Sequence, residues 1–353
     1  MRVGIYDPYL NTLGGGERFC LALASHWSKK HDVRVFWDDP RIRKEAEERL
    51  NLDLSGVKFV QNIFRGNNLI RKLFLTRQYD LIFFLSDGSI PITIAKTTVL
   101  LFQHPFVSVG GRSMWNQLKL RRVSSVVCYS RYTKAYLDRE FGTDCIVIYP
   151  PVPVNEMIAR TKENIILSVG RFGTSNTNKK QKEMVRFFRQ LSSLHADWKL
   201  YLAGGVLPQD REYFDEVKRE AHGTPITLLP NIPFSELKEL YGKAAIYWHA
   251  AGYGVRQEEN PSEMEHFGIS TVEAMASGCI PIVYGGGGQL EIVRHGIDGI
   301  IWNKEQELIE STSYVITHPR LRMRMQESAM ERAKEFNQFK FYAAFDRLIE
   351  RII

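Results

Sequence analysis

Short apolar runs alternate with stretches of helical periodicity along the first part of the chain. Most runs are rich in β-branched or aromatic residues, as in residues 33–37 (VRVFW) and 97–102 (TTVLLF). Between several of them, as in residues 16–30 and 131–142, apolar side chains return every three or four positions. Continuous apolar runs indicate buried strands, and the wider spacing indicates amphipathic helices. The alternation predicts an α/β fold with a doubly wound parallel sheet.

The pattern breaks at a proline-rich segment and then starts again. Three of the four residues 150–153 are prolines, which interrupt both helices and central strands. Apolar runs resume at residues 164–170 and recur up to residues 299–302, and the segment after residue 311 has helical periodicity. We therefore predict two α/β domains, residues 1–152 and 153–337, followed by a C-terminal helix at about residues 338–353.

The composition agrees with a folded chain of this length. Its 353 residues are 44% hydrophobic and 25% charged, which excludes collagen-like and disordered classes. No apolar run approaches the roughly 20 residues that span a bilayer, and the N-terminus lacks a signal-peptide pattern. Without a Cys-x-x-Cys pair, the cysteines are expected to be buried free thiols in a reducing compartment, so we expect a cytoplasmic protein. They are Cys20, Cys128, Cys145 and Cys279.

The net charge of +7 indicates an anionic partner. Nucleic acid, an acidic membrane surface and a phosphorylated small molecule all satisfy that condition. The chain has no RNP, helix-turn-helix or zinc-finger pattern, and its basic residues do not form a single stripe. We therefore expect no nucleic-acid partner, and the choice between the other two depends on motifs.

The first candidate anion site is a triple glycine that opens the first long helical stretch. Gly14, Gly15 and Gly16 follow the first predicted strand and precede Glu17. Glycine lets the backbone come close to a ligand, and the free amides at a helix N-terminus favour a phosphate group. The segment matches neither the dinucleotide-binding nor the P-loop fingerprint. A plain tight turn into the helix is therefore an equal alternative.

A second candidate site follows the first strand of the second domain. Arg171 ends the run of residues 168–171, and a polar loop, residues 172–178, leads to the pair Lys179 and Lys180. Ligands of open α/β sheets bind at the carboxyl ends of the strands, where these cations could neutralise a diphosphate. Two lysines that open a helix are unfavourable unless an anion binds there. The alternative is a solvated pair of surface charges.

Two glutamates lie eight positions apart in the segment from residue 249 to residue 278. Gly268 argues against one continuous helix, so we place Glu265 in a loop and start a helix near Ser270. The alternative for Glu265 is a solvated loop carboxylate. The alternative for Glu273 is structural, because Ser270-x-x-Glu273 has the spacing of a capping box. The backbone amides expected to face the same space as Glu265 belong to Phe267, Gly268 and Ile269.

Two further features follow predicted strands. Four consecutive glycines, residues 285–288, separate a strand from a helix, and such a run has a high folding entropy cost. We favour close approach of this backbone to a ligand over a plain turn. His104 follows a strand of the first domain, and its position at a carboxyl end makes a functional role as probable as a structural one.

Six segments of the sequence resemble one family, in family order from Gly14 to about Val293. They are GGGER, HPF, YSRYT with the following YPPV, SVGRF with NKKQ, EHFGISTVEAMASG and GGGGQLEIV. Together they are similar to the retaining glycosyltransferases of family 4. The most specific piece is EHFGISTVE, which supplies the family's Glu-x7-Glu element from Glu265 to Glu273.

The resemblance implies a GT-B fold, in which two Rossmann-like doubly wound domains face each other across a cleft. The C-terminal helix is then expected to pack back on the first domain. The second domain would bind a nucleotide sugar as co-substrate, with no other cofactor. The family pattern implies that Arg171 and Lys180 contact the donor diphosphate, and that Glu265 and the amides at Phe267, Gly268 and Ile269 hold the sugar.

The same resemblance extends the site to three further positions. Glu273 would meet the nucleotide ribose, which overrides part of the capping-box alternative. His104 would lie near the reacting sugar, and Gly15 or Gly16 would approach the diphosphate from the first domain. Fixed cations and amides stabilise the charge that develops on the leaving group.

No metal is expected, because the arginine and lysine of the second domain can replace Mg²⁺ and residues 38–40 (DDP) lack Asp-x-Asp spacing. A front-face reaction is the working hypothesis for retention.

The family likeness also suggests the donor and the acceptor. The overall form is most similar to members that transfer mannose from GDP-mannose in polysaccharide or lipid-linked glycan assembly, while UDP-sugars remain an alternative. A non-catalytic sugar-nucleotide-binding partner subunit is a further alternative.

Basic and aromatic stretches of the first domain could dock an anionic membrane at its cytoplasmic face, although solvated helix faces explain them nearly as well. They contain Phe64, Arg65, Arg71, Lys72, Trp115, Lys119, Arg121 and Arg122.

Overall fold

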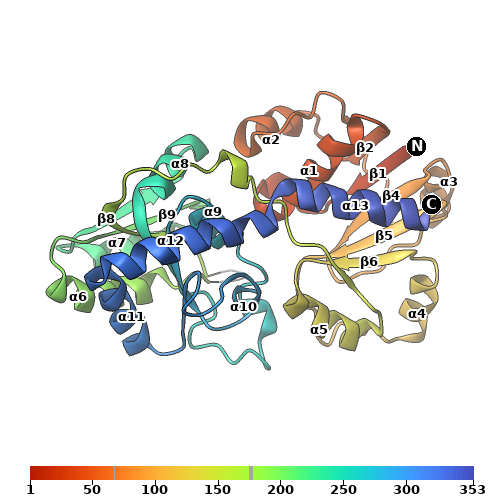
Figure 1. The fold of residues 1–353 in the computed structure, drawn as a ribbon. Helices are drawn as coiled ribbons and strands as arrows, with labels where there is room; N and C mark the ends of the chain where they lie inside the picture. Colours follow the sequence, from red (N-terminus) through yellow and green to blue (C-terminus); the bar gives the residue numbers. More distant parts are fainter. Residues whose placement is uncertain (67, 175–177) are drawn as a thin grey trace. The chain divides into compact units, whose positions relative to one another are not determined.

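The computed structural model describes residues 1–66, 68–174 and 178–353, and its chain forms two compact units (Figure 1). Unit 1 comprises Met1–Pro151 together with Phe339–Ile353, and unit 2 comprises Val152–Gln338. Among the described residues, no helix combines the length and the apolar character needed to cross a bilayer. The four cysteines are buried free thiols, as the sequence predicts.

Unit 1 is built on a seven-stranded parallel sheet in the order β3-β2-β1-β4-β5-β6-β7. The two central strands β4 and β5 are buried along their whole length, which explains their continuous apolar sequences. The strands are β1 Arg2–Tyr6, β2 Asp32–Phe36, β3 Lys58–Val60, β4 Leu81–Ser86, β5 Thr97–Phe102, β6 Ser125–Cys128 and β7 Ile146–Val147. The helices are α1 Gly15–Ser28, α2 Ile42–Leu50, α3 Leu69–Thr76, α4 Met114–Leu120, α5 Arg131–Phe141 and α13 Gln338–Ile352.

The C-terminal helix α13 packs on unit 1 beside α1. Its apolar side chains recur at the spacing of one helix face, and Phe341 and Phe345 contact Phe19 with ring centroids 4.7 Å and 5.6 Å away. Asp346 accepts hydrogen bonds from the Trp27 Nε1 at 3.2 Å and from the His26 ring at 2.9 Å. These contacts join the last helix of the chain to the core beneath β1.

Unit 2 repeats the architecture with a six-stranded parallel sheet in the order β10-β9-β8-β11-β12-β13. Its core is rich in large side chains, including the fully buried Phe188, Trp248 and Trp302. The strands are β8 Glu163–Val169, β9 Lys199–Gly204, β10 Ile226–Pro230, β11 Ala244–His249, β12 Ile280–Tyr284 and β13 Ile300–Trp302. The helices are α6 Gln181–Leu194, α7 Arg211–Ala221, α8 Phe234–Lys243, α9 Ile269–Ala276, α10 Gln289–Ile292, α11 Glu305–Thr317 and α12 Pro319–Ala333.

Both sheets reverse their strand order once. In unit 1 the order turns at β1, between β2 and β4, and in unit 2 it turns at β8, between β9 and β11. Ligands of open α/β sheets bind outside the carboxyl ends of the strands at such a switch point. The two doubly wound parallel sheets confirm the predicted fold class, and the switch points indicate where each unit can hold a ligand.

Candidate active site

A buried ion pair lies at the switch point of unit 2. Glu265 accepts a hydrogen bond from the Lys179 Nζ at 2.7 Å and a second from the His249 Nε2 at 3.0 Å. The side chains of Lys179 and Glu265 are only 23% and 15% exposed. His249 is the last residue of β11, which neighbours β8 in the sheet. Glu265 is therefore held in place by the protein and is not a solvated loop carboxylate.

Both hydrogen bonds reach the same oxygen of Glu265. Lys179 and His249 each contact Oε2, and Oε1 has no partner among the described residues. A carboxylate has about four lone-pair sites, so the second oxygen can still accept hydrogen bonds. Glu265 is thus an oriented acceptor, with one oxygen bound by the protein and the other available to a ligand.

The electrostatics of this cluster set its protonation state. Burial raises the pKa of Glu265, but the charge of Lys179 and the hydrogen bond from His249 outweigh burial and leave that pKa below its ordinary value. Burial also lowers the pKa of His249, against the opposing effect of Glu265. At neutral pH, Glu265 is therefore a carboxylate and His249 is neutral. The proton of the imidazole then resides on Nε2, because that nitrogen donates to Glu265.

The sequence did not predict the contact between Lys179 and Glu265. Arg171 and Lys180 were predicted as the cations of the site, and Lys179 was treated only as a member of the pair. In the structure Lys180 has a left-handed backbone, with φ 60°, and caps α6 without a side-chain hydrogen bond. Of the two neighbouring lysines, only Lys179 contacts Glu265.

Arg171 and Lys180 remain available to an anion. Both side chains are partly exposed, and neither forms an ion pair with any residue that the structure describes. Arg171 follows β8, so it lies at the carboxyl end of the strand at the switch point. Residues 175–177 of the predicted polar loop lie outside the described residues. The described part of the site therefore presents two unpaired positive charges beside the buried Glu265 cluster.

The glycine run 285–288 comes close to another segment of the chain. A Cβ at Gly287 would lie 2.2 Å from the Glu265 carbonyl oxygen, and a Cβ at Gly288 would lie 2.5 Å from the His266 carbonyl oxygen. The Gly288 amide donates to the Glu265 carbonyl at 2.7 Å. The close approach made by this run is therefore to the loop that carries Glu265.

We expect Gly287→Ala to destabilise the protein more than Gly223→Ala. Both residues have positive φ, 60° and 73°, but nothing lies within 4 Å of a Cβ at Gly223. The control therefore carries only the backbone cost of about 1 kcal/mol, and Gly287→Ala adds displacement of the Glu265 loop. Thermal unfolding of both variants measures the difference. Equal losses would show that the Glu265 loop does not depend on the glycine run.

The helix that follows Glu265 begins without a side-chain cap. Gly268 is its N-cap with φ 119°, and α9 starts at Ile269. The backbone conformation favours glycine there, and a Cβ at Gly268 would lie 2.2 Å from the Gln289 Nε2. Phe267 is buried. Since no side chain caps α9, its first amides can still bind an anion or a hydroxyl group.

The capping-box alternative for Glu273 is wrong. Ser270 lies inside α9 rather than at its N-cap, and its hydroxyl pairs with the Tyr247 hydroxyl at 2.8 Å. Glu273 is buried in the middle of the helix and accepts a hydrogen bond from the Tyr241 hydroxyl at 3.1 Å. Glu273 is therefore held by Tyr241, a residue that no local motif would have linked to it.

The predicted residues of unit 1 also come together. Gly15 is exposed at the start of α1, and the Gly14 amide donates to the Glu17 Oε2 at 2.6 Å. The Gly16 carbonyl accepts from the Gln103 Nε2 at 3.1 Å, and a Cβ at Gly16 would lie 2.4 Å from the Gln103 Oε1. Gln103 immediately precedes His104. The triple glycine therefore lies next to the segment that follows β5.

His104 lies two residues beyond the end of β5 and is partly buried. Burial lowers the pKa of His104, so its imidazole is neutral at physiological pH. Within unit 1, the histidine and the glycine loop thus form one candidate surface at the carboxyl ends of β1 and β5. Among the described residues, no group of three or more His, Cys, Asp or Glu side chains could hold a metal ion.

Two family profiles match consecutive parts of the chain. The profile described as Glycosyl transferases group 1 matches residues 155–332, and the profile described as Glycosyltransferase Family 4 matches residues 13–156. The first profile covers the segment with Arg171, Lys180 and the Glu265 cluster, and the second covers His104 and the triple glycine. Together they extend over both units.

The curated relatives include mannosyltransferases. The GDP-Man:Man(3)GlcNAc(2)-PP-Dol alpha-1,2-mannosyltransferase of Dictyostelium discoideum is 27% identical over 235 residues, which are 61% of this chain and 44% of that protein. The lipopolysaccharide core biosynthesis mannosyltransferase LpcC of Rhizobium leguminosarum bv. viciae is 23% identical over 262 residues, 70% of this chain and 71% of that protein. This chain thus spans less than half the length of the Dictyostelium relative.

Solved structures share the fold over nearly the whole chain. A glycosyltransferase from Rickettsia africae aligns with a TM-score of 0.77 at 17% identity and covers 99% of this chain and 98% of its own. Anabaena HepE, in complex with UDP and glucose, aligns with a TM-score of 0.75 at 17% identity, over 99% of this chain and 100% of its own. This likeness confirms the GT-B fold. The profile match over residues 155–332 shows that the chain belongs to the family of glycosyl transferases group 1.

Proposed function

We propose that this chain is a retaining, metal-independent glycosyltransferase that moves mannose from GDP-mannose to a glycan or lipid-linked acceptor. The observation that carries the proposal is the Glu265 cluster, in which Lys179 and His249 hold one carboxylate oxygen and leave the other available. The names of the mannosyltransferase relatives support mannose as the sugar and GDP as the nucleotide.

The leaving group is the diphosphate of the donor. When the bond between the sugar and the diphosphate breaks, negative charge develops on the leaving oxygen and positive charge on the anomeric carbon. Arg171 and Lys180 are unpaired cations of the described site, and the first amides of α9 have no side-chain cap. We assign these groups to the diphosphate, where two fixed cations replace a divalent metal.

Glu265 is assigned to the donor sugar. Its Oε1 can accept hydrogen bonds from sugar hydroxyls, and its negative charge favours positive charge on the anomeric carbon. We assign Glu273 to the nucleotide ribose and His104 and the Gly15–Gly16 backbone to the donor from unit 1. We do not assign Glu265 as a nucleophile, because retention by a front-face reaction requires none. In that reaction the leaving phosphate helps to remove the acceptor proton.

UDP-sugars are the second candidate donors, because one structural neighbour was solved with UDP and glucose. We expect a thermal-shift panel to discriminate them, since a ligand that binds only the native state raises the apparent stability. GDP-mannose should raise the unfolding temperature more than UDP-glucose, UDP-GlcNAc or ADP-glucose at the same concentration. A larger shift with a UDP-sugar would overturn the GDP assignment, and no shift with any of them would favour a chain that binds no donor.

Removal of divalent metal should leave transfer largely unchanged. Donor turnover is measured by the release of the free nucleoside diphosphate, with and without EDTA. A complete loss that Mg²⁺ restores would contradict the assignment of Arg171 and Lys180 as its replacement.

A further inference from the structure

The most exposed large apolar side chains of the described structure are concentrated on two short helices of unit 1. Ile70 and Phe74 of α3 and Met114 and Trp115 of α4 are between 70% and 81% exposed. The next most exposed, Leu194 in unit 2, reaches 65% and belongs to a scattered set. Single exposed apolar residues are ordinary on protein surfaces, but a concentration of them marks an interaction site.

Each helix turns one apolar face outward. Ile70 and Phe74 are four residues apart on α3, and Met114 and Leu118 are four residues apart on α4, which places each pair on one side of its helix. No residue of α4 is fully buried. Phe64, which belongs to the basic and aromatic stretches that the sequence analysis considered for membrane docking, packs against Tyr6 with ring centroids 4.8 Å apart.

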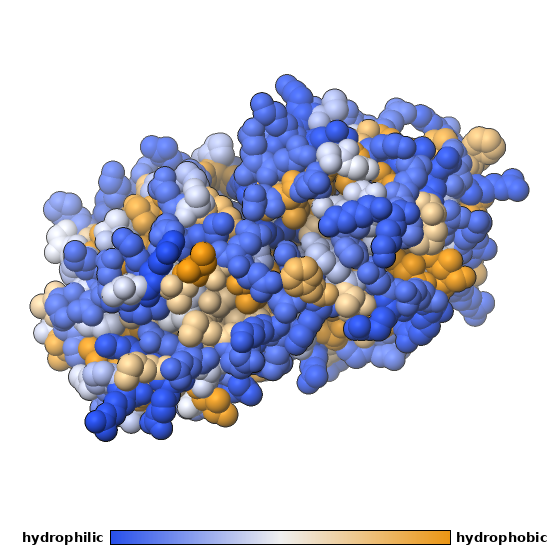
Figure 2. Space-filling model, turned by 45° about the horizontal axis from the view of Figure 1, so that its top comes forward, coloured by the Kyte–Doolittle hydropathy of each residue, from blue (hydrophilic) through white to orange (hydrophobic). Residues whose placement is uncertain are grey.

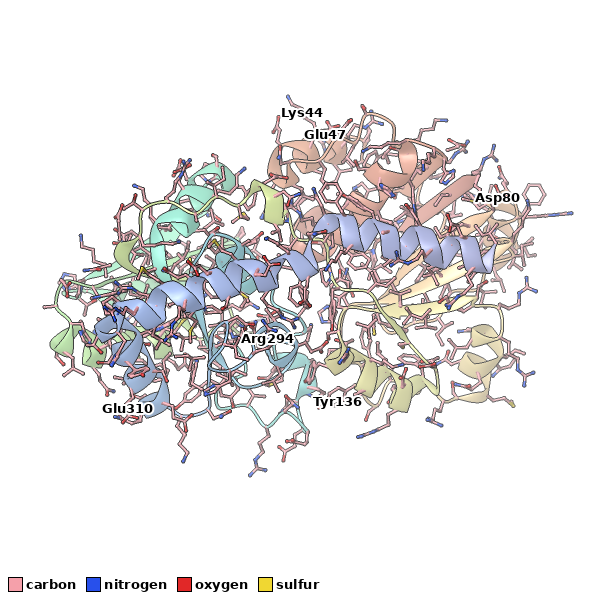
Figure 3. All side chains as sticks on the ribbon, viewed as in Figure 1. Lys44, Glu47, Asp80, Tyr136, Arg294 and Glu310 are labelled. Atoms are coloured by element: carbon pink, nitrogen blue, oxygen red, sulfur yellow. The ribbon has the colours of Figure 1, made fainter. Side chains whose placement is uncertain are left out.

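The two helices cover the same face of the sheet. Both end near the amino-terminal ends of its strands. Leu120 of α4 packs on the core cluster that contains Phe36 and Tyr79, and Leu75 of α3 lines a small cavity with those two residues. α3 is followed closely by β4 and α4 by β6. The first residue of β4 pairs with Thr97 of β5, and the first residue of β6 pairs with Val99 of the same strand. Figure 1 draws both helices at this end of the sheet. Figure 3 labels Asp80 at the same end, and Asp80 accepts a hydrogen bond from Lys96 at 2.6 Å.

The two chain segments that contain these side chains are basic. Residues 61–79 and 105–124 contain no aspartate or glutamate. Their eight positive charges exceed the net charge of +7 of the whole chain, so the rest of the chain is nearly neutral. Most of these cations form no ion pair with any described residue. The eight are Arg65, Arg71, Lys72, Arg77, Arg112, Lys119, Arg121 and Arg122.

An anionic bilayer satisfies both properties of this surface. Its headgroup region attracts lysine and arginine, and the boundary below the headgroups accepts apolar side chains and a tryptophan ring. Figure 2 shows hydrophobic residues in orange among hydrophilic ones in blue on the surface of the molecule. A second copy of this chain, docked through the same face, would bring the two sets of like charges together. Charge complementarity therefore favours lipid over self-association.

We propose that the exposed faces of α3 and α4, with the basic residues beside them, form a docking surface for an anionic phospholipid bilayer. The apolar anchors are Ile70, Phe74, Met114, Trp115 and Leu118. The benefit of docking, delivery of a lipid-linked acceptor to the enzyme, rests on the proposed function. The docking itself does not, because it requires neither donor nor turnover.

Sedimentation of the full chain with vesicles tests the surface. The chain should bind vesicles of phosphatidylcholine mixed with phosphatidylglycerol and should be released by high salt, because screening weakens the attraction to the headgroups. The double variant Phe74→Ser/Trp115→Ser should bind at least about tenfold more weakly, since two large apolar side chains no longer enter the bilayer. The double variant Arg121→Gln/Arg122→Gln should bind roughly tenfold more weakly.

Two matched variants control for general effects of substitution. Leu194→Ser/Met323→Ser removes exposed apolar side chains of unit 2, and Lys44→Gln/Arg211→Gln removes exposed cations elsewhere, one of them on α2 (Figure 3). Both controls should bind like the unchanged chain. Equal weakening in the controls, binding to pure phosphatidylcholine without regard to salt, or no binding to either vesicle would overturn the proposal.

The fluorescence of Trp115 gives a second measurement at the surface itself. The other five tryptophans are buried or partly buried, so acrylamide quenching of the exposed indole reports mainly Trp115. Anionic vesicles should protect it, and Trp115→Phe should abolish the protected signal. Self-association that the Phe74→Ser/Trp115→Ser variant removes, without vesicle binding, would assign the surface to a second copy and overturn the proposal.

Failure of the donor assignment is separable from failure of the docking surface. A chain that binds vesicles but transfers no sugar retains the surface and loses the proposed function. A chain that binds a sugar nucleotide but no vesicle loses the surface alone.

Discussion

Glu265→Gln should lower sugar transfer by about 100-fold or more while the protein remains folded. The substitution keeps the size of the side chain but removes the charge that favours the developing cation at the anomeric carbon. It also leaves the ammonium of Lys179 without its carboxylate partner. The loss should appear in kcat more than in KM, because the charge of Glu265 matters most in the transition state.

Glu263→Gln is the matched control for this variant. Glu263 lies two residues earlier on the same segment, but it is exposed and has no ion pair among the described residues. Transfer by this variant should stay near that of the unchanged chain. Transfer by Glu265→Gln within a few-fold of the control, in protein with an intact thermal transition, would remove Glu265 from the reaction.

The fold was predictable because it follows from the spacing of apolar residues and from the prolines that interrupt this pattern. The runs at residues 81–86 and 97–102 are apolar throughout, and both form strands buried on both faces. The prolines at 150–153 coincide with the boundary between the two units. These signals are local in sequence, and burial acts on every residue of the run in the same way.

The contacts of the site were less predictable because they join residues far apart in the chain. Lys179 and Glu265 are 86 positions apart, and nothing in the local sequence distinguishes Lys179 from Lys180. The structure also gives Lys180 a left-handed backbone, a conformation that is uncommon for a residue with a side chain and that the sequence does not predict. A strand end such as His249 followed by acidic residues is the one signal that could have directed attention to this cluster.

The glycine run illustrates the same limit. Its composition correctly indicated that something approaches the backbone closely, but composition does not identify what approaches. The structure identifies the Glu265–Phe267 loop as that neighbour. Likewise, Ser270 and Glu273 have capping-box spacing, yet Gly268 begins the helix two residues earlier and Tyr241 takes the glutamate. For Glu273, a tertiary contact replaced the local interpretation.

Lys179→Met and Lys180→Met should have different effects although the residues are adjacent. Loss of Lys179 removes one partner of a mostly buried ion pair, which should destabilise the protein by about 2–3 kcal/mol, less than the roughly 3–5 kcal/mol of a fully buried pair. Loss of Lys180 should leave stability unchanged, because its side chain forms no ion pair in the described structure. It should weaken donor binding and slow transfer, since Lys180 is assigned to the diphosphate.

The pH dependence of stability tests whether Lys179 holds Glu265 in its charged form. In the unchanged chain the pKa of Glu265 is lowered on folding, so its stabilising contribution is present above the unfolded value of about 4.3 and is lost as the pH falls. Without Lys179, burial raises that pKa, and the folded variant retains a proton that the unchanged protein has released. The stability gap between the two should therefore widen as the pH rises from about 4 toward 7.

Chemical denaturation of the three proteins across this pH range measures the gap. Lys180→Met should track the unchanged chain at every pH. A gap for Lys179→Met that stays constant with pH would show that Lys179 contributes packing alone and does not hold Glu265 in its charged form. Equal destabilisation by the two substitutions would contradict the separation of roles, because only Lys179 contacts the buried carboxylate.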